Sequence, residues 1–162
     1  MALLGDVVYV VCADSSVIEM YSADTLSPLR VGIHVNGMSH PSDIVACCHD
    51  RQLYVADCDY CIWRVSAYDQ SHIKWLIVTG TLHINKLSLT SRGILVMSWQ
   101  PPTLCEYNTV DAQRLREVQL PQFVKWLHHG VETSRGTFVV SHQGTSQDKK
   151  QFAVSGLFTV VV

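Results

Sequence analysis

Short apolar runs alternate with polar turns along this chain, the pattern typical of β-strands joined by tight connections. The clearest stretch is 41–66, where three runs rich in β-branched and aromatic residues follow one another. Such runs, of about four to eight residues and bounded by Asp, Ser or Gly, indicate strands. The pattern predicts strands at 44–48, 53–56 and 61–65.

This three-strand pattern recurs along the chain. The central residues of the expected second strands are spaced by 45, 41 and 43 residues; they are Tyr9, Tyr54, Leu95 and Phe138. Spacings of about 40–50 residues are typical of four-stranded propeller blades. Signals for helices are almost absent. The sequence therefore predicts an all-β fold, a β-propeller of four-stranded antiparallel blades at approximately 1–37, 38–80, 81–121 and 122–162.

The two ends of the chain suggest an incomplete ring. We expect a single strand over the apolar stretch at 1–13, so that the first blade begins at its second strand. The last blade fades after 151–154. The apolar tail at 158–162 could pair with the first blade, and left unpaired it would favour aggregation. The chain therefore supplies about three and a half blades, whereas a closed propeller ring contains about four to eight blades. We therefore expect one partial domain whose open strand edges favour self-association.

The composition of the chain disfavours some classes of binding partner. The formal charge is −2, and charged residues make up only 16% of the chain, so a general electrostatic attraction to nucleic acid or anionic membrane is disfavoured. No apolar run reaches the roughly 18 residues that span a bilayer. The six cysteines are expected to be buried free thiols, which favours a cytoplasmic location.

The most specific motif lies at 41–66. Pro41-Ser42-Asp43-Ile44-Val45-Ala46 is followed by Leu53-Tyr54-Val55-Ala56-Asp57 and then by Ile62-Trp63-Arg64-Val65. This succession resembles the NHL repeat, although Cys48 stands near the usual acid and the turn at 49–52 lacks the usual Gly. The resemblance implies a six-bladed type of ring that binds proteins or RNA, often as the substrate-recognition module of a larger ubiquitin ligase. A separate branch of six-bladed propellers contains metal-dependent lactonases and lyases.

Antiparallel pairing sorts the loops between two faces. Turns between second and third strands emerge on the same face as the connections to the next blade, and these loops carry aromatic, His and acidic residues. Such residues are favoured in protein and ligand sites. We expect binding near Tyr60, Trp99 and His142 on this face, the alternative being that they are ordinary loop residues.

A cysteine motif and a histidine pair suggest metal sites, but neither pattern is compelling. Cys58 and Cys61 have zinc-ligand spacing, and Cys47, Cys48 or His49 could add ligands. Adjacent strand residues point to opposite faces, however, so Cys47 and Cys48 cannot easily bind one ion. A turn with buried thiols is expected instead.

The histidine pair lies on an expected first strand. Together with three other polar residues it resembles the metal-binding sets of propeller lactonases; the set is His128, His129, Asp43, Asn85 and Glu132. Because adjacent strand residues point oppositely, at most one His faces the ring channel. A structural role is expected, and no metal or cofactor is predicted.

Tryptophans and arginines are the features that support RNA binding. Trp63, Trp75, Trp99 and Trp126 could stack on bases if exposed, but packing between blades is expected for 74–76 and 125–127. The turns before the second strands carry the basic residues of the other face; these are Arg51, Arg92 and Arg135.

The leading hypothesis is a non-enzymatic, NHL-like platform that binds a protein partner, with no membrane association. It would serve as the substrate-recognition part of a larger ubiquitin-ligase-like protein. A metal-dependent hydrolase or lyase is the first alternative. An RNA-binding propeller is the second, and the negative net charge disfavours it.

Overall fold

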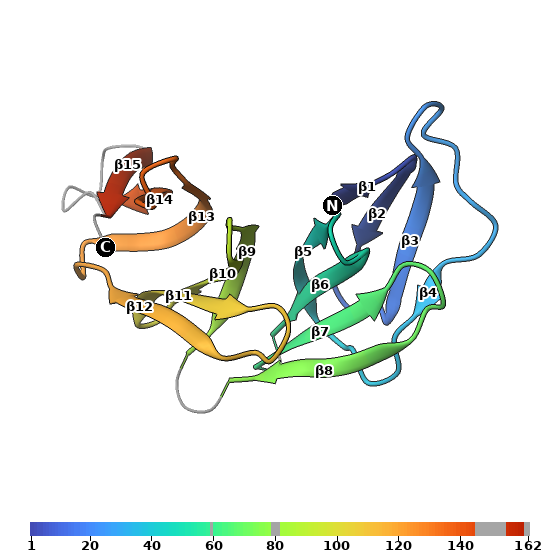
Figure 1. Ribbon diagram of the computed structural model, residues 1–162, viewed down its shortest axis with the longest axis horizontal. Coiled ribbons are helices and arrows are strands. Elements are labelled where there is room, and N and C mark those ends of the chain that lie inside the picture. The colour runs from blue at the N-terminus through green and yellow to red at the C-terminus, as the bar shows by residue number, and fades with distance from the viewer. Residues whose placement is uncertain (59, 79–81, 145–154, 161–162) are drawn as a thin grey trace. The chain divides into compact units, whose positions relative to one another are not determined.

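The computed structural model describes residues 1–58, 60–78, 82–144 and 155–160. All regular structure in these residues is β-strand (Figure 1), so they contain no helix that is long and apolar enough to cross a membrane. The chain forms two compact units, Met1–Thr79 and Gly80–Val162. Each unit contains two antiparallel sheets whose strands follow one another in chain order.

The first unit contains two four-stranded sheets (Figure 1). The strands of its first sheet are β1 (Ala2–Leu4), β2 (Val7–Val11), β3 (Val17–Ser22) and β4 (Ile33–His34). Those of its second sheet are β5 (Pro41–Cys47), β6 (Gln52–Asp57), β7 (Cys61–Ser66) and β8 (His72–Ile77). The second sheet thus contains the three strands predicted at 44–65. β5 begins three residues earlier than predicted and ends one residue earlier, β6 is one residue longer at each end, and β7 is one residue longer at its end.

Strand β1 corrects the prediction of a single strand over 1–13. Leu3 lies opposite Val8 in an antiparallel β1–β2 pair, so the first sheet does have a first strand. Gly5 adopts a positive φ of 59° between the two strands. This conformation costs a glycine little, and it lets the chain reverse within the apolar stretch. The fourth strand of this sheet is short and comprises only Ile33–His34.

The core of the first unit lies between its two sheets. Alternate residues of each sheet are buried there, including Ile18 and Ile33 from the first sheet and Leu53, Val55 and Trp63 from the second. Period-two alternation on central strands therefore supplies two facing apolar surfaces.

A buried carboxylate ties the connection between these sheets to the second sheet. Asp57, the last residue of the Leu-Tyr-Val-Ala-Asp motif, has no exposed surface. Its Oδ1 accepts a hydrogen bond from the His40 backbone N–H at 3.0 Å. Its Oδ2 accepts from the Ser39 backbone N–H at 3.1 Å and from Trp63 Nε1–H at 3.0 Å. The motif's acid thus satisfies two backbone donors and one indole, as a buried charge requires.

The second unit has a four-stranded and a three-stranded sheet (Figure 1). The four strands are β9 (Ile84–Leu89), β10 (Gly93–Trp99), β11 (Pro102–Asn108) and β12 (Arg114–Gln119). The other three are β13 (Val124–Glu132), β14 (Phe138–Gly144) and β15 (Ser155–Val160). Side chains from both sheets form one core, with Leu95, Met97, Leu127 and Phe138 almost fully buried.

Strand β15 corrects the expected pairing of the C-terminal tail. It pairs antiparallel with β14, with Phe138 opposite Val160, and so becomes the third strand of its own sheet. Residues 158–160, which could have paired with the first blade, pair instead within their own unit, and 161–162 lie outside the described residues. Sequential strands usually pair with each other, and β14 offers the nearest edge in sequence. Residues 151–154, where the blade was expected to fade, lie outside the described residues.

Candidate functional site

The three predicted binding residues have different surroundings. Tyr60 lies in the first unit, between β6 and β7, with 39% of its surface exposed. Trp99 ends β10 and His142 lies within β14, both in the second unit. His142 is buried, and its Nδ1 has no hydrogen-bond partner among the described residues. Of the three, Trp99 is the residue whose ring packs against two other rings.

Three rings form a cluster that we call the tryptophan stack: His83, Trp99 and Trp126. Trp99 and Trp126 are nearly parallel, with ring centroids 4.8 Å apart and an interplanar angle of 9°. The His83 ring lies 5.5 Å from the Trp99 ring at 35°. His83 immediately precedes β9, Trp99 ends β10 and Trp126 lies near the start of β13. All three therefore lie at the strand ends where the sequence predicted binding.

A β-bulge places Trp126 in this stack. Lys125 pairs with Gln143 and Leu127 pairs with His142, so Trp126 has no partner in the ladder. Its φ is 51°, a left-handed conformation that is strained for a bulky aromatic residue. Val124 and Leu127 on either side are fully buried, whereas Trp126 is 48% exposed. The bulge thus keeps two core residues inside while it turns a tryptophan outward.

The two lysine-tryptophan-leucine segments, expected to behave alike, differ. Trp75 is 8% exposed and packs edge-on against Tyr54, with ring centroids 4.9 Å apart, so the packing prediction was right there. It was wrong for Trp126. The signal lay in the spacing of Val124 and Leu127: apolar core residues three positions apart cannot share one face of a regular strand.

The other ends of the same strands carry a buried ion-pair network. Glu106 is 1% exposed. Its Oε2 accepts hydrogen bonds from Arg92 Nη2 at 3.0 Å and Arg116 Nε at 2.6 Å, and its Oε1 accepts from Thr90 Oγ1 at 2.6 Å. Burial would raise the pKa of Glu106, but the bonds from Arg116 and Thr90 and the charges of Arg116 and Arg92 outweigh it. The pKa of Glu106 therefore lies below its ordinary value.

Arg116 extends the network to the neighbouring sheet. Its Nη2 donates to Glu132 Oε1 at 3.0 Å and its Nη1 to the Gly136 carbonyl at 2.9 Å. The guanidinium also lies 4.4 Å from the Phe138 ring centroid. The Ser91 backbone N–H donates to Glu132 Oε2 at 2.7 Å. This N–H is the largest influence on Glu132 and holds the pKa of its carboxyl below the ordinary value.

The residues weighed as lactonase-like ligands have other partners or lie on the surface. Asn85 Nδ2 donates to the Leu127 carbonyl at 2.7 Å, and Glu132 is bonded to Arg116. His128 and His129 are both exposed. In the part of the chain that the structure describes, no three His, Cys, Asp or Glu residues group closely enough to hold a metal ion.

The six cysteines are free thiols, but not all are buried. Cys61 and Cys105 are 2% and 3% exposed, one in each unit. The exposed thiols are Cys12, Cys48 and Cys58. The expectation of buried thiols was therefore wrong for these three, because they lie at strand ends and turns.

In each unit a hollow lies at the strand ends that carry the turn arginines. One, of about 340 Å³ in the first unit, is lined by Leu4, Tyr9, Cys48, Arg51 and Tyr68 among others. The other, of about 420 Å³ in the second unit, lies over the Arg116 network. Binding was predicted at the opposite strand ends, and no local sequence pattern indicates either hollow.

No protein-family model and no curated protein matches this chain. Solved structures do resemble it. Hydrazine synthase of Kuenenia stuttgartiensis aligns with a TM-score of 0.75 and 14% identity, over 98% of this chain and 49% of that one. A structural genomics protein of unknown function from Bacteroides thetaiotaomicron aligns with a TM-score of 0.64 and 11% identity, over 88% of this chain and 41% of that one. The fold is of the β-propeller type. At such low identity the likeness shows the fold alone, and this propeller chain spans less than half the length of either structure.

Proposed function

We propose that this chain is a non-enzymatic binding platform whose tryptophan stack contacts a protein partner. The observation that carries the proposal is the state of Trp126. A strained backbone conformation costs about 1–3 kcal/mol, and such strain clusters at functional sites. Here the strain leaves a large ring 48% exposed, backed by Trp99. A ring that only filled the core would not need this bulge.

The chemistry of the stack suits a protein surface. Tryptophan is enriched among the residues that carry most of the energy of protein interfaces. Because Trp99 already supports one side of the Trp126 ring, little side-chain freedom remains to be lost when a partner covers the other side. The formal charge of −2 favours a protein partner over RNA.

We further propose that the propeller is of the NHL kind. Support comes from residues 41–66, where the motif resemblance lies and where Asp57 holds the preceding connection. A place as the substrate-recognition part of a larger ubiquitin-ligase-like protein follows from that resemblance. The hydrolase alternative is disfavoured because Asn85 and Glu132 already hold structural hydrogen bonds.

The test is a selection of peptides from a displayed random library on the purified chain, followed by affinity measurements with Trp126→Ala. We expect Trp126→Ala to weaken the selected peptides about tenfold or more, as for a central interface residue. Tyr68→Ala is the matched control, because Tyr68 is 86% exposed in the first unit. It should leave the affinity unchanged.

Other outcomes would redirect the proposal. Peptide binding that Trp126→Ala leaves intact would contradict it. Salt-dependent binding of single-stranded RNA that Trp126→Ala abolishes would favour the RNA alternative. Stoichiometric metal in the purified protein would favour the hydrolase. Light scattering on the same sample tests the proposed self-association, which would show as a mass above that of one chain.

A further inference from the structure

The larger hollow has a wall rich in arginine. It opens beside the β9–β10 and β13–β14 turns, at the strand ends opposite the tryptophan stack. We call it the arginine groove; its polar lining includes Ser91, Arg92, Arg116, Glu132, Ser134 and Arg135. Its volume of about 420 Å³ is ample for a small charged group.

The carboxylates of the groove are already fully engaged. Both oxygens of Glu106 and both oxygens of Glu132 accept hydrogen bonds from fixed donors. Arg116 is held by three hydrogen bonds and by the Phe138 ring. Arg92, Arg116 and Arg135 line the groove, and only Glu106 and Glu132 offset their charges, so a net positive charge of one remains. That charge resides on the arginines that are less firmly held.

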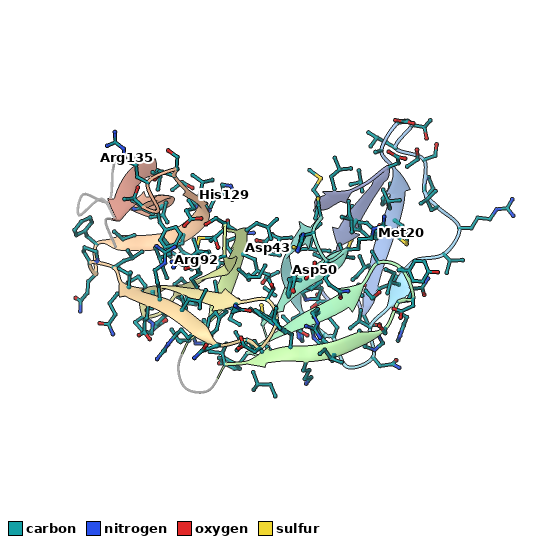
Figure 2. The ribbon with its side chains drawn as sticks, viewed as in Figure 1. Met20, Asp43, Asp50, Arg92, His129 and Arg135 are labelled. Carbon is teal, nitrogen blue, oxygen red and sulfur yellow. The ribbon has the colours of Figure 1, made fainter. Side chains whose placement is uncertain are left out.

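Arg92 and Arg135 have guanidinium N–H groups that no acceptor of the groove occupies. The Arg92 side chain is 54% exposed, and only its Nη2 is bonded, to Glu106. The Arg135 guanidinium has no partner among residues 82–144 and 155–160. Arg92 lies close to the body of the unit, whereas Arg135 extends outward from it (Figure 2). The Ser134 hydroxyl likewise has no hydrogen bond within the described second unit, whereas the Ser91 side chain hydrogen-bonds to Glu132.

We propose that the arginine groove binds a phosphate monoester. Arg92, fixed by Glu106, offers the remaining N–H groups of its guanidinium to the phosphate oxygens, and guanidinium geometry matches such oxyanions. Arg135 folds over the group from solvent, and the Ser134 hydroxyl donates to the same oxygens. A phosphate monoester carries about −1.5 to −2 charge at pH 7 and three acceptor oxygens, enough to engage Arg92, Arg135 and Ser134 together.

The hollow of the first unit shows that a turn arginine alone does not make such a site. Arg51 occupies the same turn position as Arg92 and Arg135, but it is the only charged residue that lines its hollow within the described part of that unit. Its neighbours there include Leu4, Tyr9 and Cys48. Arg51 therefore provides a matched control.

The experiment titrates the full chain with inorganic phosphate, a capped phosphoserine peptide and the same peptide unphosphorylated, all at constant ionic strength, by calorimetry. We expect saturable binding of both phosphate probes and none of the unphosphorylated peptide. Arg92→Gln should raise the Kd by about tenfold, since a hydrogen bond to a charged group contributes roughly that factor or more. Arg135→Gln should raise it by about threefold, and Arg51→Gln should not change it.

The arms of the titration also identify the source of the phosphate. A phosphopeptide that binds at least about tenfold tighter than inorganic phosphate supports a phosphorylated protein segment. Equal affinities support a small phosphorylated molecule. Absence of saturable binding, or binding that Arg92→Gln and Arg135→Gln both leave intact, would overturn the proposal. If Arg92→Gln fails to fold, Arg135→Gln decides, because the Arg135 side chain forms no hydrogen bond or ion pair within the described residues. Neither result depends on Trp126.

Discussion

At the residue scale, one buried acid explains why the Leu-Tyr-Val-Ala-Asp motif ends as it does. Asp57 accepts three hydrogen bonds while fully buried, from two backbone N–H groups and the Trp63 indole. A carboxylate suits this place because it is acceptor-only. The motif residue therefore acts on the connection before β5 as well as on its own strand.

Replacing this carboxylate should be costly. In Asp57→Asn the amide nitrogen can only donate, so at least one of the three donors loses its acceptor. An unsatisfied buried donor costs about 1–3 kcal/mol, and we expect a loss of this size in the free energy of unfolding. Urea unfolding followed by circular dichroism measures it. Asp24→Asn, an exposed substitution, is the control, and an equal effect of both variants would refute this role of Asp57.

At the element scale, most strands were predictable and the irregular ones were not. The repeat of about 40–50 residues placed the second strands β2, β6, β10 and β14, because each is a central strand with a strong apolar signal. β1 was missed because a three-residue strand and its glycine turn resemble one interrupted strand.

The candidate site was predictable only in part, for the same physical reason. Trp99 could be placed at the binding end from strand parity alone. Trp126 could not, since its exposure depends on a bulge, in which an extra residue interrupts the alternation of side chains between the two faces. The arginine groove depends on ion pairs between residues far apart in sequence, such as Arg116 and Glu132, which no local pattern reveals.

The β10–β11 hairpin gives an element-scale prediction. Gly93 pairs with Asn108, and a Cβ atom added at Gly93 would overlap the Tyr107 carbonyl oxygen. Gly93→Ala must therefore separate the two strands, and we expect it to cost about 1–3 kcal/mol, as overpacking does. Thermal unfolding measures the loss. Gly5→Asn is the control, because the space around Gly5 is open and Asn tolerates its positive φ. A wild-type melting temperature for Gly93→Ala would contradict this close approach.

At the scale of the whole molecule, the ion-pair network makes the free energy of unfolding depend on pH in the acidic range. Glu106 and Glu132 both have a pKa below the ordinary value in the folded protein. The unfolded chain therefore binds more protons than the folded one near their ordinary pKa of about 4.3. Stability from this source is fully present above that pKa and is lost as the pH falls through the lower, folded values.

We accordingly expect the free energy of unfolding to be flat from about pH 7 to 5 and to fall toward about pH 3. Glu106→Gln should lower it by about 3 kcal/mol at neutral pH, because it removes one member of a buried ionic network, and should make the acid dependence shallower. Denaturant titrations across this range measure both effects. Glu117→Gln, which removes a partly exposed ion pair with Arg114, should change little. If Glu106→Gln left the pH dependence of the free energy of unfolding unchanged, the ion-pair network could not be its cause.

Each unit contains a buried cysteine whose rate of chemical labelling can report how often that unit opens. Cys61 and Cys105 are buried, one per unit, so each can react with a thiol reagent only when its own unit opens. With the other four cysteines replaced by serine, the labelling rate of each buried thiol reports the opening of its unit. Equal rates would mean that the two units open together, and unequal rates that one unit opens while the other stays folded.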